Sequence, residues 1–334
     1  MNDNDNDEAP VTSRRLFVGA VAGSLVAGAA MAQQAGGVQA AGPVRKPRPN
    51  YPKPPFKRQK QEWPGLASKM TPPPDHGESS YQGRGKLAGR KALITGGDSG
   101  MGRAAAIAYA REGADVAIGY LPAEEPDARD VAELIRKAGR KAVLLPGDIR
   151  DEAFCKKLVE DAVRQLGGLD ILVNNAARQQ STDSILDLTT EQFDWTLKTN
   201  LYAMFWITKA AVPHLKPGSC IINTASVQAY DPSPNLLDYS QTKAAQVAFT
   251  KALAKQLADK GIRVNAVAPG PVWTPLQVTG GQKPEALDKF GEDVAMKRPG
   301  QPAELASAYV ALASDEASYT TAHVYGVAGG KGQP

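Results

Sequence analysis

Tyr239 and Lys243 could perform acid/base chemistry together. They stand four residues apart in a segment with helical character, so both side chains project from one face of the expected helix. A nearby ammonium favours the ionised form of a phenol, which would let the tyrosine exchange a proton with a substrate. Alone, such a pair is more often an exposed surface pair than a catalytic one, so its significance depends on the surrounding sequence.

A glycine-rich loop lies between an expected strand and an expected helix. The apolar run 92–95 is followed by Gly96-Gly97-Asp98-Ser99-Gly100-Met101-Gly102 and then by an alanine-rich stretch to Glu112. In this arrangement Gly96 permits a sharp turn, Gly100 lets the backbone approach a pyrophosphate, and Gly102 lets the helix pack on the strand. The pattern predicts a dinucleotide-binding site.

Short apolar strands alternate with helical periods throughout the rest of the chain. This alternation predicts an α/β fold: a single doubly wound parallel-sheet Rossmann domain over residues 87–334, preceded by an N-terminal extension. Ligands of such sheets bind at the carboxyl ends of the strands. The further expected strands are 116–118, 142–145, 171–173, 221–222, 264–267 and 323–325.

The motifs together resemble the short-chain dehydrogenase/reductase family, over roughly Leu87 to Gly330. A closer likeness is to bacterial NADP-dependent aldehyde reductases and glucose/ribitol dehydrogenase-like proteins that carry a proline-rich arm. The family resemblance is carried by 95–102, Asn174-Asn175-Ala176-Ala177, Asn200, Ser226, Tyr239/Lys243 and Pro269-Gly270, and the subgroup likeness by Lys69-Met70-Thr71-Pro72, 96–100 and 236–239.

The resemblance implies a catalytic tetrad of Asn200, Ser226, Tyr239 and Lys243. Tyr239 would exchange a proton with the substrate oxygen, which requires a phenol pKa well below its ordinary value of about 10. Lys243 and the positive nicotinamide of the oxidised cofactor would both lower that pKa, and Lys243 would also hydrogen-bond the nicotinamide ribose. Ser226 would steady the substrate oxygen, and Asn200 would hold a water that links Lys243 to solvent.

The resemblance also implies a set of cofactor-binding residues. Asp148 would bind the adenine amino group, although it could instead cap the helix that begins near Asp151. Ala177 departs from the family, which usually has glycine there. The full set is Gly96, Asp98, Ser99, Gly100, Met101, Gly102, Tyr120, Asp148, Ile149, Asn174, Ala176, Tyr239, Lys243, Pro269, Gly270, Val272 and Thr274.

The end of the second expected strand bears on the choice of dinucleotide. The sequence there, Ile118-Gly119-Tyr120, contains no carboxylate that would repel a 2′-phosphate. We therefore expect NADP to be preferred, with NAD as the alternative cofactor. Arg103 is the one candidate for a phosphate partner near Tyr120.

Residues 1–32 resemble a twin-arginine export signal, with Ser13-Arg14-Arg15 before an apolar run and a cleavage pattern ending at Ala32. This predicts a periplasmic protein; an uncleaved inner-membrane anchor and a cytoplasmic location are the alternatives. Residues 33–86 form a proline-rich basic arm. It is interpreted either as a solvated linker or as an arm whose Tyr51, Phe56 and Trp63 anchor it on a neighbouring subunit.

The composition restricts the partners. A net charge of +4 is small for 334 residues and argues against a nucleic-acid partner. The three histidines and two cysteines show no metal-ligand spacing, and we expect no metal and two free thiols, Cys155 and Cys220.

The resemblance implies a homotetramer acting on a small aldehyde, ketone, sugar or polyol. A lid at 271–298 would select the substrate, with Trp273, Phe290 and Met296 as lining or packing residues. The direction of the reaction stays open. A catalytically silent dinucleotide sensor is the rival interpretation from another class of protein.

Overall fold

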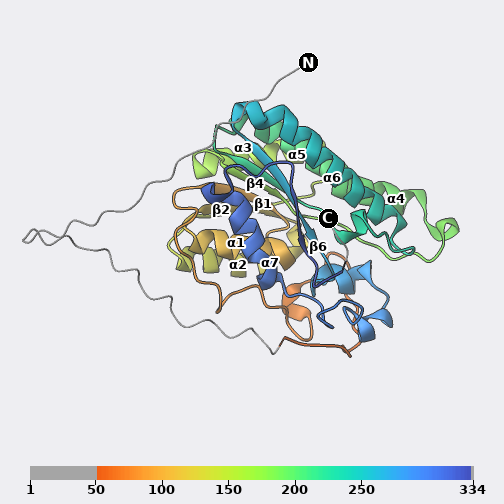
Figure 1. The fold of residues 1–334 in the computed structure, drawn as a ribbon. Coiled ribbons are helices and arrows are strands. Elements are labelled where there is room, and N and C mark those ends of the chain that lie inside the picture. Colours follow the sequence, from red (N-terminus) through yellow and green to blue (C-terminus); the bar gives the residue numbers. More distant parts are fainter. Residues whose placement is uncertain (1–50, 332–334) are drawn as a thin grey trace, which may run out of the picture. The chain divides into compact units, whose positions relative to one another are not determined.

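A seven-stranded parallel sheet forms the centre of the computed structural model, which describes residues 51–331 (Figure 1). The strand order β3-β2-β1-β4-β5-β6-β7 runs outward in both directions from β1 and β4, so the predicted doubly wound architecture is confirmed. The strands are β1 (Lys91–Thr95), β2 (Asp115–Tyr120), β3 (Ala142–Pro146), β4 (Ile171–Asn174), β5 (Cys220–Thr224), β6 (Arg263–Pro269) and β7 (Val324–Val327).

Helices cover both faces of the sheet, as parallel strands require. Apolar residues of α1, α2 and α7 share one core cluster with the sheet, and those of α3, α5 and α6 share the other. Every residue of β5 and β6 is buried, which explains their nearly continuous apolar sequence. The helices are α1 (Gly100–Arg111), α2 (Glu125–Lys137), α3 (Glu152–Leu166), α4 (Thr190–Leu197), α5 (Ala203–Ala211), α6 (Leu237–Leu257) and α7 (Pro302–Ala313).

A π-helical turn, η4 (Lys198–Tyr202), joins α4 directly to α5. Such turns insert an extra residue into a helix and are often found at functional sites. Here the turn contains Asn200, whose side chain is buried. The irregular turn therefore places one of the predicted tetrad residues inside the molecule.

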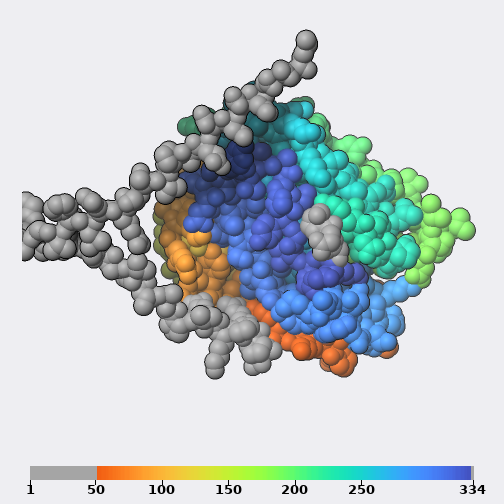
Figure 2. Space-filling model, viewed as in Figure 1, coloured from red at the N-terminus to blue at the C-terminus, as the bar shows by residue number. Residues whose placement is uncertain are grey.

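The described part of the arm, 51–86, packs against its own chain. Phe56 stacks on Trp273 of the lid with ring centroids 4.4 Å apart, and the indole Nε1 of Trp273 donates to the carbonyl of Pro72 at 2.8 Å. Figure 2 shows the orange arm beside the light-blue residues of the lid. The solvated-linker interpretation is therefore wrong for these residues. Phe56 does act as an anchor, but on the lid of its own domain.

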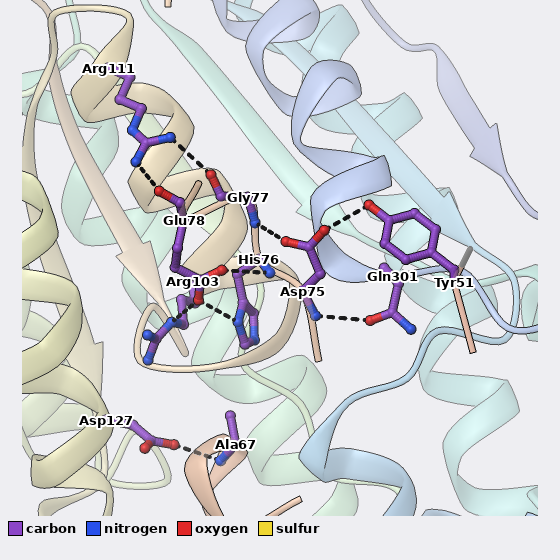
Figure 3. A network of polar contacts seen from close by, with 10 residues as sticks. All are labelled: Tyr51, Ala67, Asp75, His76, Gly77, Glu78, Arg103, Arg111, Asp127 and Gln301. Atoms are coloured by element: carbon purple, nitrogen blue, oxygen red, sulfur yellow. Dashed lines mark hydrogen bonds and ion pairs between the residues drawn. The ribbon is translucent and has the colours of Figure 1, made fainter. Parts of the chain in front are cut away.

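Polar contacts fix the second half of the arm (Figure 3). The backbone N–H of Asp75 donates to Oε1 of Gln301 at 2.9 Å, and Arg111 donates to the carbonyl of Gly77 at the same distance. Nε of Arg103 lies 3.2 Å from Oε1 of Glu78. The arm is thus fastened to α1 and to the start of α7, so residues 51–86 belong to the same compact unit as the sheet.

Three further findings concern the described residues. Cys155 and Cys220 are both free and buried, as predicted. Within 51–331 there is no cluster of three His, Cys, Asp or Glu residues that could hold a metal ion. In the same range no helix has both the length and the apolar character needed to cross a bilayer. The predicted signal, 1–32, and the start of the arm lie outside the described residues.

Candidate active site

A cavity of about 500 Å³ lies at the carboxyl ends of the central strands, where the fold predicts a ligand. Its lining residues come from the glycine loop, the ends of β2 to β6, α6 and the lid. Most of the predicted site residues line it: Gly96, Asp98, Ser99, Gly100, Met101, Tyr120, Asp148, Ile149, Ala176, Ser226, Tyr239, Lys243, Pro269, Gly270, Val272 and Thr274.

Tyr239 and Ser226 meet in the cavity from different elements. Tyr239 lies in the first turn of α6 and Ser226 lies two residues after the end of β5, and both side chains line the cavity. Ser226 also accepts from the backbone N–H of Gln228 at 3.2 Å, so it caps the short turn that follows. The two hydroxyls form a pair that can bind one substrate oxygen from two directions.

Lys243 is 1 % exposed, and its ammonium is held by neighbours other than the phenol. Nζ donates to the carbonyl of Thr224 at 2.7 Å and to Oε1 of Gln246 at 3.1 Å. Nζ lies 5.3 Å from the ring centroid of Tyr239. Burial lowers the pKa of Lys243 to about 7, so its positive charge is partial at neutral pH.

The predicted depression of the Tyr239 pKa is not found. Burial instead raises the pKa of the phenol to about 12, although the hydrogen bond from Ser226 opposes the rise. The prediction counted the charges of Lys243 and of an oxidised nicotinamide but not the cost of removing the phenol and the amine from water. A depressed phenol pKa would need positive charge in the cavity beyond that of Lys243.

Asn200 lies behind the cavity, outside its lining. Its Oδ1 accepts from the backbone N–H of Arg178 at 2.8 Å, and its Nδ2 donates to the carbonyl of Arg178 at 2.9 Å. Its backbone carbonyl accepts from Gln246 at 2.7 Å, and Gln246 in turn accepts from Lys243. The connection from Asn200 to Lys243 therefore runs through Gln246. The water-holding role stays a prediction.

The glycine loop fits a pyrophosphate. Helix α1 begins at Gly100, and its N-cap Ser99 makes no side-chain capping bond, so the first N–H groups remain available to an anion. A Cβ on Gly102 would lie 2.0 Å from the carbonyl oxygen of Gly96. Gly102 is absent from the lining, and its role is the predicted close packing of helix on strand.

Two carboxyl groups lie at the adenosine end of the cavity: that of Asp98, a predicted cofactor-binding residue, and that of Glu124, which the sequence analysis missed. Asp98 and Glu124 both line it near Tyr120, and the Asp98 carboxyl is buried without a hydrogen-bond partner in the described structure. Burial raises the pKa of both groups, that of Glu124 to about 9. Glu124 could not be found by looking at the last residue of β2, because it comes from the next turn.

Arg103 is not available as a phosphate partner. It is 9 % exposed, its guanidinium pairs with Glu78 of the arm, and it lies outside the lining. The suggestion that it sits beside Tyr120 for this purpose is therefore wrong. An arginine in the first turn of a helix is near the loop in sequence, but here its side chain points toward the arm.

Asp148 lines the cavity and does not cap α3. Both carboxylate oxygens of Asp148 accept from Nε of Arg150, at 2.9 and 3.0 Å, and the N-cap of α3 is Asp151.

Asn174 lies outside the lining, because its Nδ2 donates to Oδ1 of Asn223 at 2.9 Å inside the core. Asn174 thus ties β4 to β5 and does not reach the cofactor pocket. Ala177 is not among the residues with positive φ, which explains why alanine is tolerated there.

The three aromatic and apolar lid residues have different environments. Phe290 lines the cavity, whereas Trp273 is fully buried against Phe56 and Met296 is 55 % exposed. Trp63 and Pro64 of the arm also line the cavity, which the sequence analysis missed. Nothing in a proline-rich segment indicates which of its aromatic residues reaches a pocket formed by distant residues.

Known proteins similar to this chain define its family. A family model described as enoyl-(acyl carrier protein) reductase matches residues 96–331. The chain is 57 % identical over 288 residues to "Uncharacterized oxidoreductase YghA" of Escherichia coli, covering 86 % of this chain and 98 % of that protein. That match is longer than the stretch from Leu87 to the C-terminus, so it includes part of the arm.

Two plant relatives have names that state an activity. The chain is 44 % identical to "Glucose and ribitol dehydrogenase" of Daucus carota, over 82 % of this chain and 96 % of that one. It is 42 % identical to "NADPH-dependent aldehyde reductase 1, chloroplastic" of Arabidopsis thaliana, over 82 % of this chain and 97 % of that protein.

A short-chain dehydrogenase from Burkholderia cenocepacia, solved in complex with NADP, superposes with a TM-score of 0.69 at 32 % identity, over 73 % of this chain and 98 % of that one. The protein belongs to the short-chain dehydrogenase/reductase family. It is an NAD(P)-dependent oxidoreductase acting on carbonyl or CH–OH groups, as predicted.

Proposed function

We propose that the protein reduces small aldehydes to alcohols with NADPH. The observation that carries the proposal is the pair of hydroxyls of Ser226 and Tyr239 facing one cavity, with the buried Lys243 beside them. The similarity to a plant protein named as an NADPH-dependent aldehyde reductase supports the substrate class.

The chain's own residues account for the proton in this reaction. The bound dinucleotide would supply the hydride that forms the new C–H bond at the carbonyl carbon. Tyr239 donates its phenolic proton to the carbonyl oxygen, which completes the alcohol and leaves a phenolate. Ser226 donates a hydrogen bond to that oxygen while negative charge develops on it. A phenol with a pKa of about 12 keeps its proton at neutral pH, so the donor form is the resting form.

The glycine loop and the strand ends hold the dinucleotide. The N–H groups at the start of α1 suit the pyrophosphate, and Lys243 lies where it could reach a ribose hydroxyl. The raised pKa values, about 9 for Glu124 and about 7 for Asp98, would reduce the negative charge of both carboxyls at neutral pH and so their repulsion of a 2′-phosphate, which is consistent with NADP as the preferred cofactor. NADP is also the cofactor in the solved Burkholderia relative.

Oxidation of a sugar or polyol is the second candidate function. The catalytic end of the cavity is lined by polar side chains that could hydrogen-bond several hydroxyls of one substrate, and a relative is named a glucose and ribitol dehydrogenase. The same tetrad would run in reverse, with Tyr239 accepting the proton. These polar residues are Gln179, Gln228, Ser233 and Asn235.

A panel of aldehydes, sugars and polyols, assayed with NADPH, NADH and their oxidised forms, tests the proposal. We expect the highest kcat/KM for an aldehyde with NADPH. A higher value for a polyol with an oxidised dinucleotide would favour the second function. Absence of turnover in every pairing would favour a silent dinucleotide sensor, which the complete tetrad argues against.

Location and assembly are further parts of the proposal. We propose export to the periplasm through the twin-arginine signal of residues 1–32 and assembly as a homotetramer. Mass spectrometry of the periplasmic fraction would show whether the N-terminus begins after Ala32. Light scattering of the purified protein would give the number of subunits.

A further inference from the structure

A short segment of the arm, residues 61–67, contributes to the wall of the cofactor cavity and is bonded to the lid at one end and to α2 at the other. The backbone N–H of Gln61 donates to the carbonyl of Val278 in the lid at 3.0 Å. Six residues later, the N–H of Ala67 donates to Oδ2 of Asp127 in α2 at 2.6 Å (Figure 3). The lid borders the catalytic end of the cavity and α2 follows the adenosine end, so the segment spans from one end to the other.

Close packing fixes this segment between its two ends. Gly65 is buried, and a Cβ there would lie 2.4 Å from Cγ2 of Thr279, so the backbone of the segment touches the lid directly. Asp127 is fully buried at the opposite end. The path of residues 61–67 is therefore set by contacts on both sides of the cavity.

Trp63 and Pro64, in the middle of this segment, form part of the cavity wall. The ring of Trp63 lies edge-on to Trp195 of α4, with centroids 5.1 Å apart and an interplanar angle of 80°. Trp195 is itself covered by the guanidinium groups of Arg150 and Arg178, 4.4 and 4.5 Å from its ring centroid. The Trp63 indole is thus held rigidly by an aromatic and cationic stack.

From this geometry we infer that Trp63 is a cofactor-binding residue, and that residues 61–67 form a strap that must detach before the dinucleotide can leave. A dinucleotide lying along the glycine loop extends from the adenosine end to the catalytic end, beneath the strap. The large, half-buried indole would contact the bound molecule and exclude water from it. The inference rests on dinucleotide binding by this family member and does not depend on which carbonyl substrate is used.

The stack behind Trp63 also leads toward the tetrad. Arg178, which covers Trp195, is the residue whose backbone N–H and carbonyl hold the side chain of Asn200. This contact to Asn200 is made by the backbone of Arg178 and not by Trp63, so the tetrad keeps its position without the strap. The strap acts mainly on retention of the cofactor. We expect substitution of Trp63 to change dinucleotide dissociation more than the chemical step.

Stopped-flow fluorescence of NADPH release, without any aldehyde, tests the strap. We expect Trp63→Ala to accelerate dissociation and weaken affinity by about tenfold, since loss of a buried tryptophan contact acts mostly through the dissociation rate. Trp63→Phe should lie between that variant and the wild type. Lys69→Ala changes an exposed residue of the arm outside the strap and should leave both quantities unchanged.

Hydrogen exchange of the wild-type protein supplies a readout that needs no substitution. The N–H groups of Gln61 and Ala67 should exchange more slowly when NADPH is bound, because the strap cannot open without releasing the ligand. Unchanged exchange on binding, or a Trp63→Ala variant that releases NADPH within twofold of the wild-type rate, would overturn the strap. If NADPH does not bind at all, it is the proposed function that fails.

Discussion

The catalytic tetrad and the arm–lid region are held in place in different ways. Tyr239, Ser226 and Lys243 sit on or directly after core elements, and their positions follow from the sheet and α6. The arm and lid depend on side-chain contacts between residues about 200 or more positions apart, such as Phe56 on Trp273 and Arg58 with Asp288. The sheet and α6 thus hold the catalytic side chains in position, whereas these long-range contacts hold the arm and the lid in position at the entrance of the cavity.

This difference separates the expected effects of substitutions. Changes in the tetrad should reduce turnover and leave the entrance intact, because the lid makes its own small core of Phe56, Met70, Trp273, Val278, Leu287 and Phe290. Changes in that small core should loosen binding and leave the chemical step nearly unchanged.

Lys243→Met should have the largest effect among these variants. It removes the amine that lies 5.3 Å from the Tyr239 ring centroid while nearly keeping the buried volume, so kcat/KM for aldehyde reduction should fall about 10²-fold or more. Steady-state kinetics would measure the loss. Lys251→Met, an exposed position on the same helix, is the matched control and should keep wild-type kinetics. Wild-type turnover by the Lys243 variant would remove the lysine from the mechanism.

Gly102→Ala should disrupt the cofactor site without touching the tetrad. Its Cβ would collide with the Gly96 carbonyl, so the loop must shift and NADPH affinity should fall at least about tenfold. Fluorescence titration would measure the change. Gly300→Ala adds a methyl group with only ordinary contacts and should bind NADPH normally. Equal affinity of the two variants would contradict the assigned packing role of Gly102.

Phe56→Ala tests whether the contacts between arm and lid affect substrate binding separately from the chemical step. It removes a buried ring from the small lid core, a change that costs about 3 kcal/mol or more when the cavity cannot collapse. We expect faster hydrogen exchange over 273–290 and a several-fold higher KM for the aldehyde, with kcat within about twofold of the wild-type value. The exposed Lys57→Ala is the control. A large loss of kcat with normal KM would show that the arm reaches the tetrad.

Cofactor preference should change moderately with pH. The raised pKa values of Asp98 and Glu124 mean that both groups hold their protons to higher pH than usual and ionise as the pH rises. The new negative charges should repel a 2′-phosphate; the neighbouring Asp127 raises the pKa of Asp98 and Arg103 lowers it. We expect NADPH to lose affinity relative to NADH between about pH 6 and pH 9. Glu124→Gln should flatten this trend; an unchanged slope would contradict the assignment.

The sequence predicted what local patterns specify. The glycine loop, the alternation of strands and helices, and the Tyr239/Lys243 spacing were sufficient to place the cofactor cavity and three of the four tetrad residues on its wall. These features could be found because strand ends in a parallel sheet converge at one edge. The position of Asn200 in a π-helical turn, by contrast, has no simple sequence signature.

What the sequence analysis missed depends on long-range packing and desolvation. Trp63 reaches the cavity because Gln61 and Ala67 bind partners in the lid and in α2, and proline-rich composition does not reveal such contacts. Arg103 was assigned to the wrong partner because the arm supplies Glu78. The pKa of Tyr239 was placed too low because burial, which outweighs the nearby lysine, follows from the folded structure alone.

The most direct test compares Tyr239→Phe with the wild type in two assays, aldehyde turnover and NADPH binding. The variant keeps the ring and loses only the proton donor, so we predict that turnover falls about 10³-fold or more while NADPH affinity stays within about threefold. Turnover within tenfold of the wild-type rate would contradict the assignment of Tyr239 as the proton donor.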